Sequence, residues 1–423
     1  MLERVELFDE RRDYLLFALL ALVLLVFSLS FEYYHYAKLK AHKTAVIKAH
    51  VLNEYLKTTS KKSYKVIKLR SSHGATFYTT ASTRFHTVKD KDVLIKIYTS
   101  RLSFLDYLKG FYTKGWFLKT LQTDTFKSKL DALLRSTHKE HDIYRIYAAL
   151  YLAKPLTYEL YNRFSALGIS HLFAISGFHL GILSFVVYTL LFFLYKPLHA
   201  RYFPYRNIKR DTFIATAIVL FFYLDFLAYP PSLVRSFAML TVGFILYDRG
   251  IEVISMQTLF IAVVLILAIS PRLAFSLGFW LSVSGVYYIM LFLIYFKDLP
   301  IWKQFFLIPI WVYLAMLPIT LYIFGNFSYL HPFSIILSIL FTLFYPLSLA
   351  LHFIGYGELL DPLLSWIVHT PLEIYKVTFS TWFLIPYVLL SLAALKNKKL
   401  FYSLGMTAFL VFCYAVVYEV YWK

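Results

Sequence analysis

The chain has 423 residues, of which 59% are hydrophobic, 20% are aromatic and only 16% are charged. A soluble chain carries nearer to a quarter charged residues, so the composition excludes an ordinary soluble protein and indicates that lipid solvates most of the chain. A single cysteine, Cys413, excludes an intramolecular disulfide and any cysteine-based metal cluster.

The net charge of +19 is concentrated in one segment. Residues 38–130 hold 20 Lys+Arg against 5 Asp+Glu, whereas the rest of the chain holds 23 against 19. Such a segment is either a solvated domain near anionic lipid headgroups or a surface that binds a polyanion, because neutralised phosphates release their counterions.

Residues 1–37 predict a short cytoplasmic tail and the first transmembrane helix. The apolar run 14–31 follows three arginines, Arg4, Arg11 and Arg12, which is the pattern of an uncleaved signal anchor. At about 1.5 Å per residue, this run is just long enough to cross a hydrocarbon core of ~30 Å.

Residues 38–120 predict a small β domain. The runs 64–70 and 92–98 alternate between apolar and polar residues, and 76–80 is rich in strand formers. The turn residues at 71–74 separate two of these runs. We therefore expect several short antiparallel strands in a small barrel or sheet.

The predicted β domain is basic and aromatic, as single-strand nucleic-acid binders are, with charge for phosphates and rings for bases. Its aromatic residues either stack on bases or fill the small core: Tyr55, Tyr64, Phe77, Tyr78, Phe85 and Tyr98. Its densest basic cluster is either a nucleic-acid contact or a solvated strand face: Lys61, Lys62, Lys65, Lys68 and Arg70.

Residues 121–167 predict amphipathic helices that are too charged to span a membrane. These helices either lie in the interface plane or cap the mouth of a pore. From 168 to 423 the chain is almost continuously apolar. The candidate spans there are 170–195, 212–229, 231–248, 254–270, 273–296, 303–325, 331–355, 379–395 and 400–421.

The polar stretch 359–377 either crosses the membrane or forms a re-entrant segment. The predicted fold class is therefore a polytopic α-helical membrane protein with about 10–11 transmembrane helices and one small β domain. With the basic tail and the basic loop 196–211 inside, the β domain falls outside, because long domains cross largely regardless of charge. The basic cluster 396–399 also lies inside only if 359–377 crosses fully.

One motif in the apolar part resembles a family signature. Residues 171–183 read His-Leu-Phe-Ala-Ile-Ser-Gly-Phe-His-Leu-Gly-Ile-Leu, which closely resembles the signature of the ComEC family and its competence domain. Three weaker similarities follow in the family's order. They are Pro-Pro-Ser-Leu-Val-Arg at 230–235, Ser-Pro at 270–271 with Gly-Phe-Trp-Leu-Ser at 278–282, and Pro318 with Phe324-Gly325 and Ser328. Trp280 stands where the family usually has Gln, which weakens any hydrogen-bonding role there.

The resemblance implies an inner-membrane channel that translocates single-stranded DNA into the cytoplasm during natural transformation. It implies an OB-like β domain facing the periplasm or outside, although no residues match there. The implied partners are single-stranded DNA, membrane lipid, a periplasmic DNA receptor and a cytoplasmic helicase-like motor. No phosphate-binding G-x-x-x-x-G-K-[ST] loop occurs, so the force is expected from that motor.

Many members of that family end in a metallo-β-lactamase-like domain. This chain has no H-x-H-x-D-H run, so we expect a short form without that zinc hydrolase. We accordingly predict no enzyme activity, no cofactor and no metal site, and we expect a separate nuclease if one strand is degraded.

The candidate channel-lining or signature residues are His171, Ser176, Gly177, His179, Gly181 and Arg235. Eight positions separate the two histidines, so one continuous helix would place them on one broad face. Gly177 and Gly181 form a G-x-x-x-G pattern that allows close helix approach. These residues either line a pore or serve ordinary helix packing.

Arg235 lies one turn into a helix that Pro230-Pro231 would begin. It either contacts phosphates at a pore mouth, or reaches the interface, or pairs with Asp225.

Two other functions remain open. A small-molecule or lipid-linked substrate transporter would need midplane acids and inverted repeats, of which only Asp225 is a candidate acid. A membrane hydrolase would use Ser176 with His179 as its base, and no third orienting group is evident.

Overall fold

The computed structural model describes residues 11–59, 62–89, 91–121, 126–173, 175–248 and 255–421. Within these ranges the chain divides into two compact units, which are described one at a time. The N-terminal unit contains the chain up to Leu130 together with Ile261–Trp280. The helical unit contains Asp131–Phe260 together with the chain from Leu281 onward.

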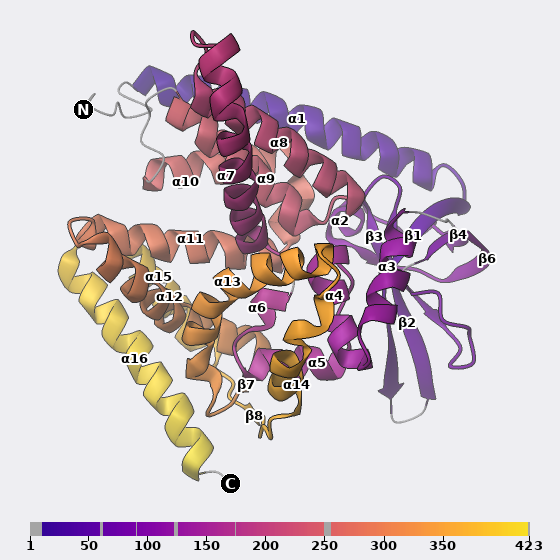
Figure 1. The fold of residues 1–423 in the computed structure, drawn as a ribbon. Coiled ribbons are helices and arrows are strands. Elements are labelled where there is room, and N and C mark those ends of the chain that lie inside the picture. The colour runs from indigo at the N-terminus through magenta and orange to yellow at the C-terminus, as the bar shows by residue number, and fades with distance from the viewer. Residues whose placement is uncertain are drawn as a thin grey trace. The chain divides into compact units, whose positions relative to one another are not determined.

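The N-terminal unit combines one long helix with a six-stranded sheet (Figure 1). Its elements are α1 (Arg11–Lys40), β1 (Thr44–Thr59), β2 (Lys62–Ser71), β3 (Thr76–Ala81), β4 (Asp92–Tyr98), α2 (Phe104–Lys109), β5 (Phe111–Tyr112), β6 (Gly115–Leu121) and η1 (Pro271–Phe275). The strands predicted at 64–70, 76–80 and 92–98 are confirmed as β2, β3 and β4.

The sheet closes on itself through one short segment. Its strand order is β5-β3-β2-β1-β4-β6, antiparallel throughout except for the parallel pair β3 and β5. Strands β5 and β6 lie at opposite ends of this order, although only Thr113 and Lys114 separate them in the chain. The segment 111–121 therefore bridges β3 and β4, and the sheet curves round. The more specific assignment as OB-like stays a prediction.

Alternating residues of the central strands fill the core of the β domain. Ile67, Leu69 and Ile95 are each 0% exposed, and they belong to a cluster that also includes Phe77. Because successive strand residues point to opposite faces, Lys68 between Ile67 and Leu69 faces away from this core and is partly exposed.

Helix α1 is longer than the predicted first span. Its 30 residues cover about 45 Å, more than the ~30 Å of a hydrocarbon core. Its last turns place Tyr36 in the core of the β domain, where the hydroxyl donates to the Leu102 carbonyl at 3.0 Å. The first membrane helix and the β domain are therefore one continuous structure.

Arg272, in η1, ties several segments of the N-terminal unit together. Its guanidinium pairs with the Glu32 carboxylate of α1, and it donates to the Tyr107 hydroxyl of α2 at 2.9 Å and to the His73 carbonyl at 3.1 Å. One side chain thus connects the first helix, a hairpin turn of the sheet and α2.

The remaining elements follow in chain order, from magenta to yellow in Figure 1. They are α3 (Phe126–Thr137), α4 (His141–Leu152), α5 (Tyr158–Ala166), α6 (Ser170–Phe173), α7 (Gly177–Tyr202), α8 (Ile208–Phe226), α9 (Pro231–Asp248), α10 (Met256–Ile269), α11 (Leu277–Phe296), α12 (Ile301–Phe324), β7 (Asn326–Phe327), η2 (His331–Phe333), α13 (Ser334–Phe353), η3 (Gly357–Leu360), α14 (Asp361–His369), β8 (Tyr375–Lys376), α15 (Thr381–Ala393) and α16 (Lys398–Tyr421).

The helices confirm a multi-pass membrane protein. Among the described residues, six helices are long and apolar enough to cross a membrane: Arg12–Lys40, Gly177–Tyr202, Leu277–Phe296, Ile301–Phe324, His331–Phe353 and Lys398–Val417. Three more of the predicted runs contain shorter apolar stretches among the described residues: Ser232–Ile245, Met256–Ile269 and Thr381–Ala393. The remaining predicted run, 212–229, overlaps the 19-residue helix α8.

The polar stretch 359–377 does not form a span-length helix. It contains α14, whose nine residues cover about 14 Å, and the two-residue strand β8. A full helical crossing there, which the eleven-span prediction required, is therefore wrong, whereas the re-entrant alternative stays a prediction.

The predicted amphipathic helices of 121–167 are present as α3, α4 and α5. Helix α4 is buried along nearly its whole length, including Ile143, Tyr147 and Leu150. A helix lying on a lipid surface would keep one polar face in water. The burial of α4 therefore favours a helix packed within the protein, while its depth relative to the membrane stays a prediction.

Candidate functional site

The signature segment is broken rather than continuous. The short helix α6 ends at Phe173, and α7 begins at Gly177 with Ser176 as its extended N-cap residue. His171 and His179 therefore lie on different helices, and the prediction that they share one helix face is wrong. The apolar pattern of 170–195 does not predict this break, where the Ile175 carbonyl accepts a hydrogen bond from Ser232 Oγ.

Ser176 and His179 together begin α7. The Ser176 N–H donates to His179 Nδ1 at 3.3 Å, and Ser176 Oγ lies 3.1 Å from the same nitrogen. The His179 ring then packs edge-on against Phe341 and Tyr345 of α13, and it is only 1% exposed. The pair thus acts as a helix cap in a packed environment, which accounts for its spacing without hydrolysis.

The start of α7 lies directly against the start of α9. A Cβ added at Gly177 would meet Ser236 Oγ at 2.5 Å, and Ser232 Oγ donates to the Ile175 carbonyl at 2.6 Å. At Gly181 an added Cβ would meet nothing within 4 Å. The predicted close approach is therefore found at Gly177 and not at Gly181.

A second close approach lies just before the signature segment. Gly168 has φ +73°, and a Cβ there would lie 2.9 Å from the His331 ring. His331 Nδ1 lies 2.9 Å from the Tyr313 hydroxyl, and Ser328 Oγ donates to the Ala166 carbonyl at 2.8 Å. The end of α5 and the residue Gly168 that leads into the signature segment therefore contact the β7–η2 region.

Three histidines from separate elements gather at this place. His179 and His331 each lie within electrostatic range of His171, which is exposed, whereas His331 is buried. The sequence reasoning missed His331, because no spacing rule links residue 331 to the signature. Within the described ranges, no three or more His, Cys, Asp or Glu residues are arranged to hold a metal ion.

Arg235 is buried in α9, with 5% of its surface exposed. Protein atoms therefore cover most of its side chain, and the contact with phosphates at a pore mouth stays a prediction. Asp225, the predicted alternative partner, accepts a hydrogen bond from Tyr229.

The structure separates the predicted basic residues of the β domain into different roles. Lys65 pairs with Glu54 at 2.8 Å and donates to the Phe85 carbonyl at 2.7 Å, so its charge is already neutralised within the protein. Lys62 is exposed, and Lys68 Nζ lies 5.6 Å from the centre of the Tyr78 ring. Lys61 lies outside the described residues.

Arg70, the last of that basic cluster, is half-buried on β2. Burial, and then the neighbouring charge of Arg272, lower the pKa of Arg70. The Arg70 guanidinium therefore lies near that of Arg272, whose own charge is paired with the Glu32 carboxylate.

The predicted aromatic residues of the β domain also divide between two roles. Phe77 is fully buried and Phe85 packs against the same core, whereas Tyr55 and Tyr98 are 44% and 45% exposed. Tyr64 and Tyr78 are half-buried.

The sequence reasoning missed an aromatic partner on β6. Trp116 is 49% exposed and meets Tyr98 at 4.9 Å between ring centres, and it lies in register with the exposed Lys96 of β4. We call Lys96, Tyr98 and Trp116 the aromatic–basic patch. It offers two ring faces beside a cation on one face of the sheet.

The fold and this site define a class: a multi-pass membrane protein with a small basic β domain. A family model described as Competence protein matches residues 153–422, and this is well over half of the chain. The chain therefore belongs to the Competence protein family, and its resemblance to ComEC is confirmed. At the level of the family, its role is in DNA uptake. Neither the curated proteins nor the solved structures gave a significant match.

Proposed function

We propose that this chain is the inner-membrane channel that translocates single-stranded DNA into the cytoplasm during natural transformation. The family match over 153–422 is the observation that carries the proposal, because it includes the signature segment and its contacts with α9 and η2. The β domain faces the periplasm or outside in this proposal, as the basic tail and the loop 196–211 favour.

The β domain captures the incoming strand in this proposal. Tyr98 and Trp116 supply faces on which bases stack, and Lys96 lies beside them for the phosphates. The exposed Lys62 adds charge on β2, as do the less exposed Lys68 and Arg70. Stacking with charge is tolerant of sequence, and an uptake channel requires this tolerance because it must accept any DNA.

The signature region then forms part of the path. Polar side chains within membrane helices are costly and usually face a bundle interior or a wet cavity. The exposed His171 beside His179, Ser176 and His331 is such a concentration of polar groups. A periplasmic receptor delivers the DNA, a cytoplasmic helicase-like motor pulls it, and a separate nuclease degrades the second strand where degradation occurs.

The test is uptake of labelled DNA by cells that lack this protein, with DNA outside and DNA in the cytoplasm scored separately. We expect external DNA to accumulate normally and cytoplasmic DNA to disappear. The wild-type gene should restore entry, and so should Tyr205→Ala, which alters a fully exposed loop residue. Normal cytoplasmic entry without the protein would overturn the channel and favour the small-molecule or lipid-linked transporter.

A further inference from the structure

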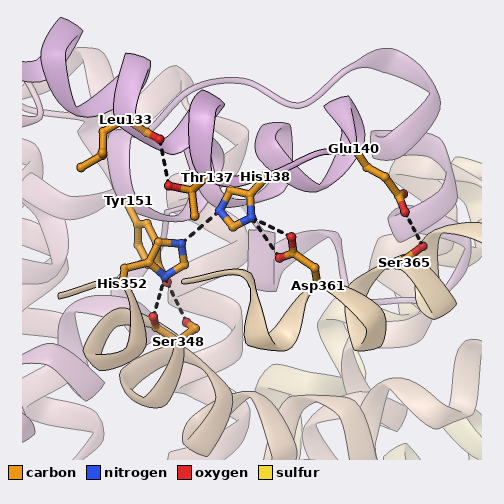
Figure 2. A network of polar contacts seen from close by, with 9 residues as sticks. All are labelled: Leu133, Thr137, His138, Glu140, Tyr151, Ser348, His352, Asp361 and Ser365. Atoms are coloured by element: carbon orange, nitrogen blue, oxygen red, sulfur yellow. Dashed lines mark hydrogen bonds and ion pairs between the residues drawn. The ribbon is translucent and has the colours of Figure 1, made fainter. Parts of the chain in front are cut away.

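A part-buried network of hydrogen bonds in the helical unit is centred on two histidines that lie outside the signature segment (Figure 2). His138, between α3 and α4, places Nδ1 at 2.9 and 3.0 Å from the two carboxylate oxygens of Asp361. Its Nε2 lies 3.1 Å from Nε2 of His352 near the end of α13. Nδ1 of His352 lies 2.6 Å from the Ser348 carbonyl oxygen.

When both histidine rings are neutral, this hydrogen-bond network lacks one proton. A carboxylate and a carbonyl only accept, so both Nδ1 atoms must carry a hydrogen. A neutral imidazole has one N–H, and the two Nε2 atoms would then face each other with bare lone pairs at 3.1 Å. That arrangement repels, whereas one added proton turns it into an N–H···N hydrogen bond of ordinary length.

We propose that His138 and His352 form a proton-binding site that holds one shared proton between their Nε2 atoms, with Asp361 as the counter-ion. The proton belongs to the histidine pair because a carboxylic acid is a stronger acid than an imidazolium. The three groups are then neutral together, which is the form that a buried site favours.

The surroundings of the pair support a site built for this purpose. The His138 side chain is 0% exposed, and that of Asp361 is 21% exposed. The Tyr147 ring of α4 stacks on His138 with 4.4 Å between ring centres. A Cβ added at Gly357 of η3 would meet the His352 ring at 2.7 Å, so only glycine leaves room for the ring there.

The other titratable groups near the pair do not compete for this proton. Burial, and then the charge of Asp361, raise the pKa of Tyr147. Burial likewise raises the pKa of Tyr151, whose hydroxyl donates to Ser348 Oγ at 2.8 Å. Lys139 and Glu140 next to His138, and Glu358 of η3, are exposed to solvent.

The shared proton joins three segments: the linker between α3 and α4, the end of α13 and the start of α14 (Figure 2). In an unfolded chain near pH 8, both histidines are neutral, because the ordinary pKa of histidine is about 6.5. Folding then takes up one proton. The free energy of unfolding therefore falls as the pH rises above that value, until the folded site also loses its proton.

The experiment compares thermal unfolding of the full chain in detergent at about pH 7 and about pH 9. His352→Gln keeps an N–H donor for His138 without a titratable proton. His369→Gln is the matched control. His369 is also a histidine near a carboxylate, but it is exposed and its distance to the Glu140 carboxylate is 4.0 Å, longer than the contacts of His138. We expect Tm to fall by roughly 2–4 °C in the wild type and in His369→Gln, and to stay level in His352→Gln.

An equal fall in His352→Gln would overturn the proposal. So would a fall in wild-type Tm on addition of EDTA at constant pH, because a bound metal ion would then occupy the two nitrogens. A second measurement needs no folded variant. Nitrogen-15 spectra of histidine-labelled wild-type protein in lipid should show three of the four ring nitrogens of this pair protonated at about pH 7, and two protonated nitrogens would contradict a shared proton.

Discussion

At the scale of single residues, the signature glycines differ in ways that their spacing hides. Gly177 and Gly181 look equivalent in a G-x-x-x-G pattern, yet only Gly177 lies against another helix. The sequence pattern predicts close helix packing at such a pair, but it does not show which of the two glycines faces α9. In the structure, Ser232 of α9 donates a hydrogen bond to the Ile175 carbonyl, just before α7 begins.

Gly177→Ala should therefore reduce both stability and DNA uptake. The added Cβ would lie 2.5 Å from Ser236 Oγ and 3.2 Å from Ser236 Cβ, so Ser236 must turn away and α7 must shift slightly against α9, at a cost of about 1–3 kcal/mol. Gly181→Ala is the matched control and should leave uptake and the unfolding temperature nearly unchanged. Equal losses in both variants would contradict a specific role for the contact at Gly177.

A second residue-scale prediction concerns acid stability of the β domain. Burial alone would raise the pKa of Asp92, but hydrogen bonds from His50 and Lys48 outweigh burial and leave its pKa lowered. A carboxylate with a lowered pKa stabilises the fold above about pH 4, and this stability is lost as the pH falls through the folded value. The free energy of unfolding can be followed by tryptophan fluorescence at a series of pH values. In Asp92→Asn it should fall less steeply on the acid side than in the wild type. Asp298→Asn, at an exposed position, should leave that profile unchanged.

At the scale of elements, sequence patterns located most segments and missed their interruptions. The strands at 64–70, 76–80 and 92–98 follow from alternation and strand-forming residues, which are local properties. The break between α6 and α7 and the short helix α14 do not follow, because apolar composition alone does not distinguish one continuous helix from two packed pieces. Arg272 was missed for a similar reason, since its partners are far away in sequence.

Arg272→Gln should loosen the N-terminal unit. It removes the partner of the half-buried Glu32 and a donor to the His73 carbonyl, and breaking such a pair costs roughly 3 kcal/mol. We expect faster proteolysis within the β domain of the full-length protein. The double variant Glu32→Gln/Arg272→Gln should be less sensitive than the single variant, because no unpaired charge remains. A double variant that is more sensitive than Arg272→Gln alone would argue against this pair.

At the scale of the whole molecule, composition and charge established the membrane class and the basic domain, and the signature motif pointed to the family. What the sequence could not assign is which charges are free. Lys65 belongs to the densest basic run, yet Glu54 neutralises it. Lys96 and Trp116 stand apart in the sequence and meet only because β4 pairs with β6.

The aromatic–basic patch should account for a measurable share of single-stranded DNA binding by the purified full-length protein. Trp116→Ala removes a stacking face worth about 1–3 kcal/mol per base, so affinity should fall by roughly tenfold or more. Lys96→Ala should reduce the steepness of a plot of the logarithm of the binding constant against the logarithm of the salt concentration by about 1. Trp382→Ala, at a residue that is 85% exposed in the helical unit, is the control. Unchanged affinity in Trp116→Ala would remove the patch from the proposed path.

The most direct test of the account is to catch DNA in transit by photo-crosslinking. A photoreactive amino acid would replace the exposed His171 in one strain and Phe185 of α7, which is 71% exposed, in another, and cells would be illuminated during uptake. We predict that incoming DNA becomes attached to the protein at position 171 and not at position 185. Uptake that proceeds normally in both strains with no DNA attached at position 171 would contradict passage of the strand through the signature region.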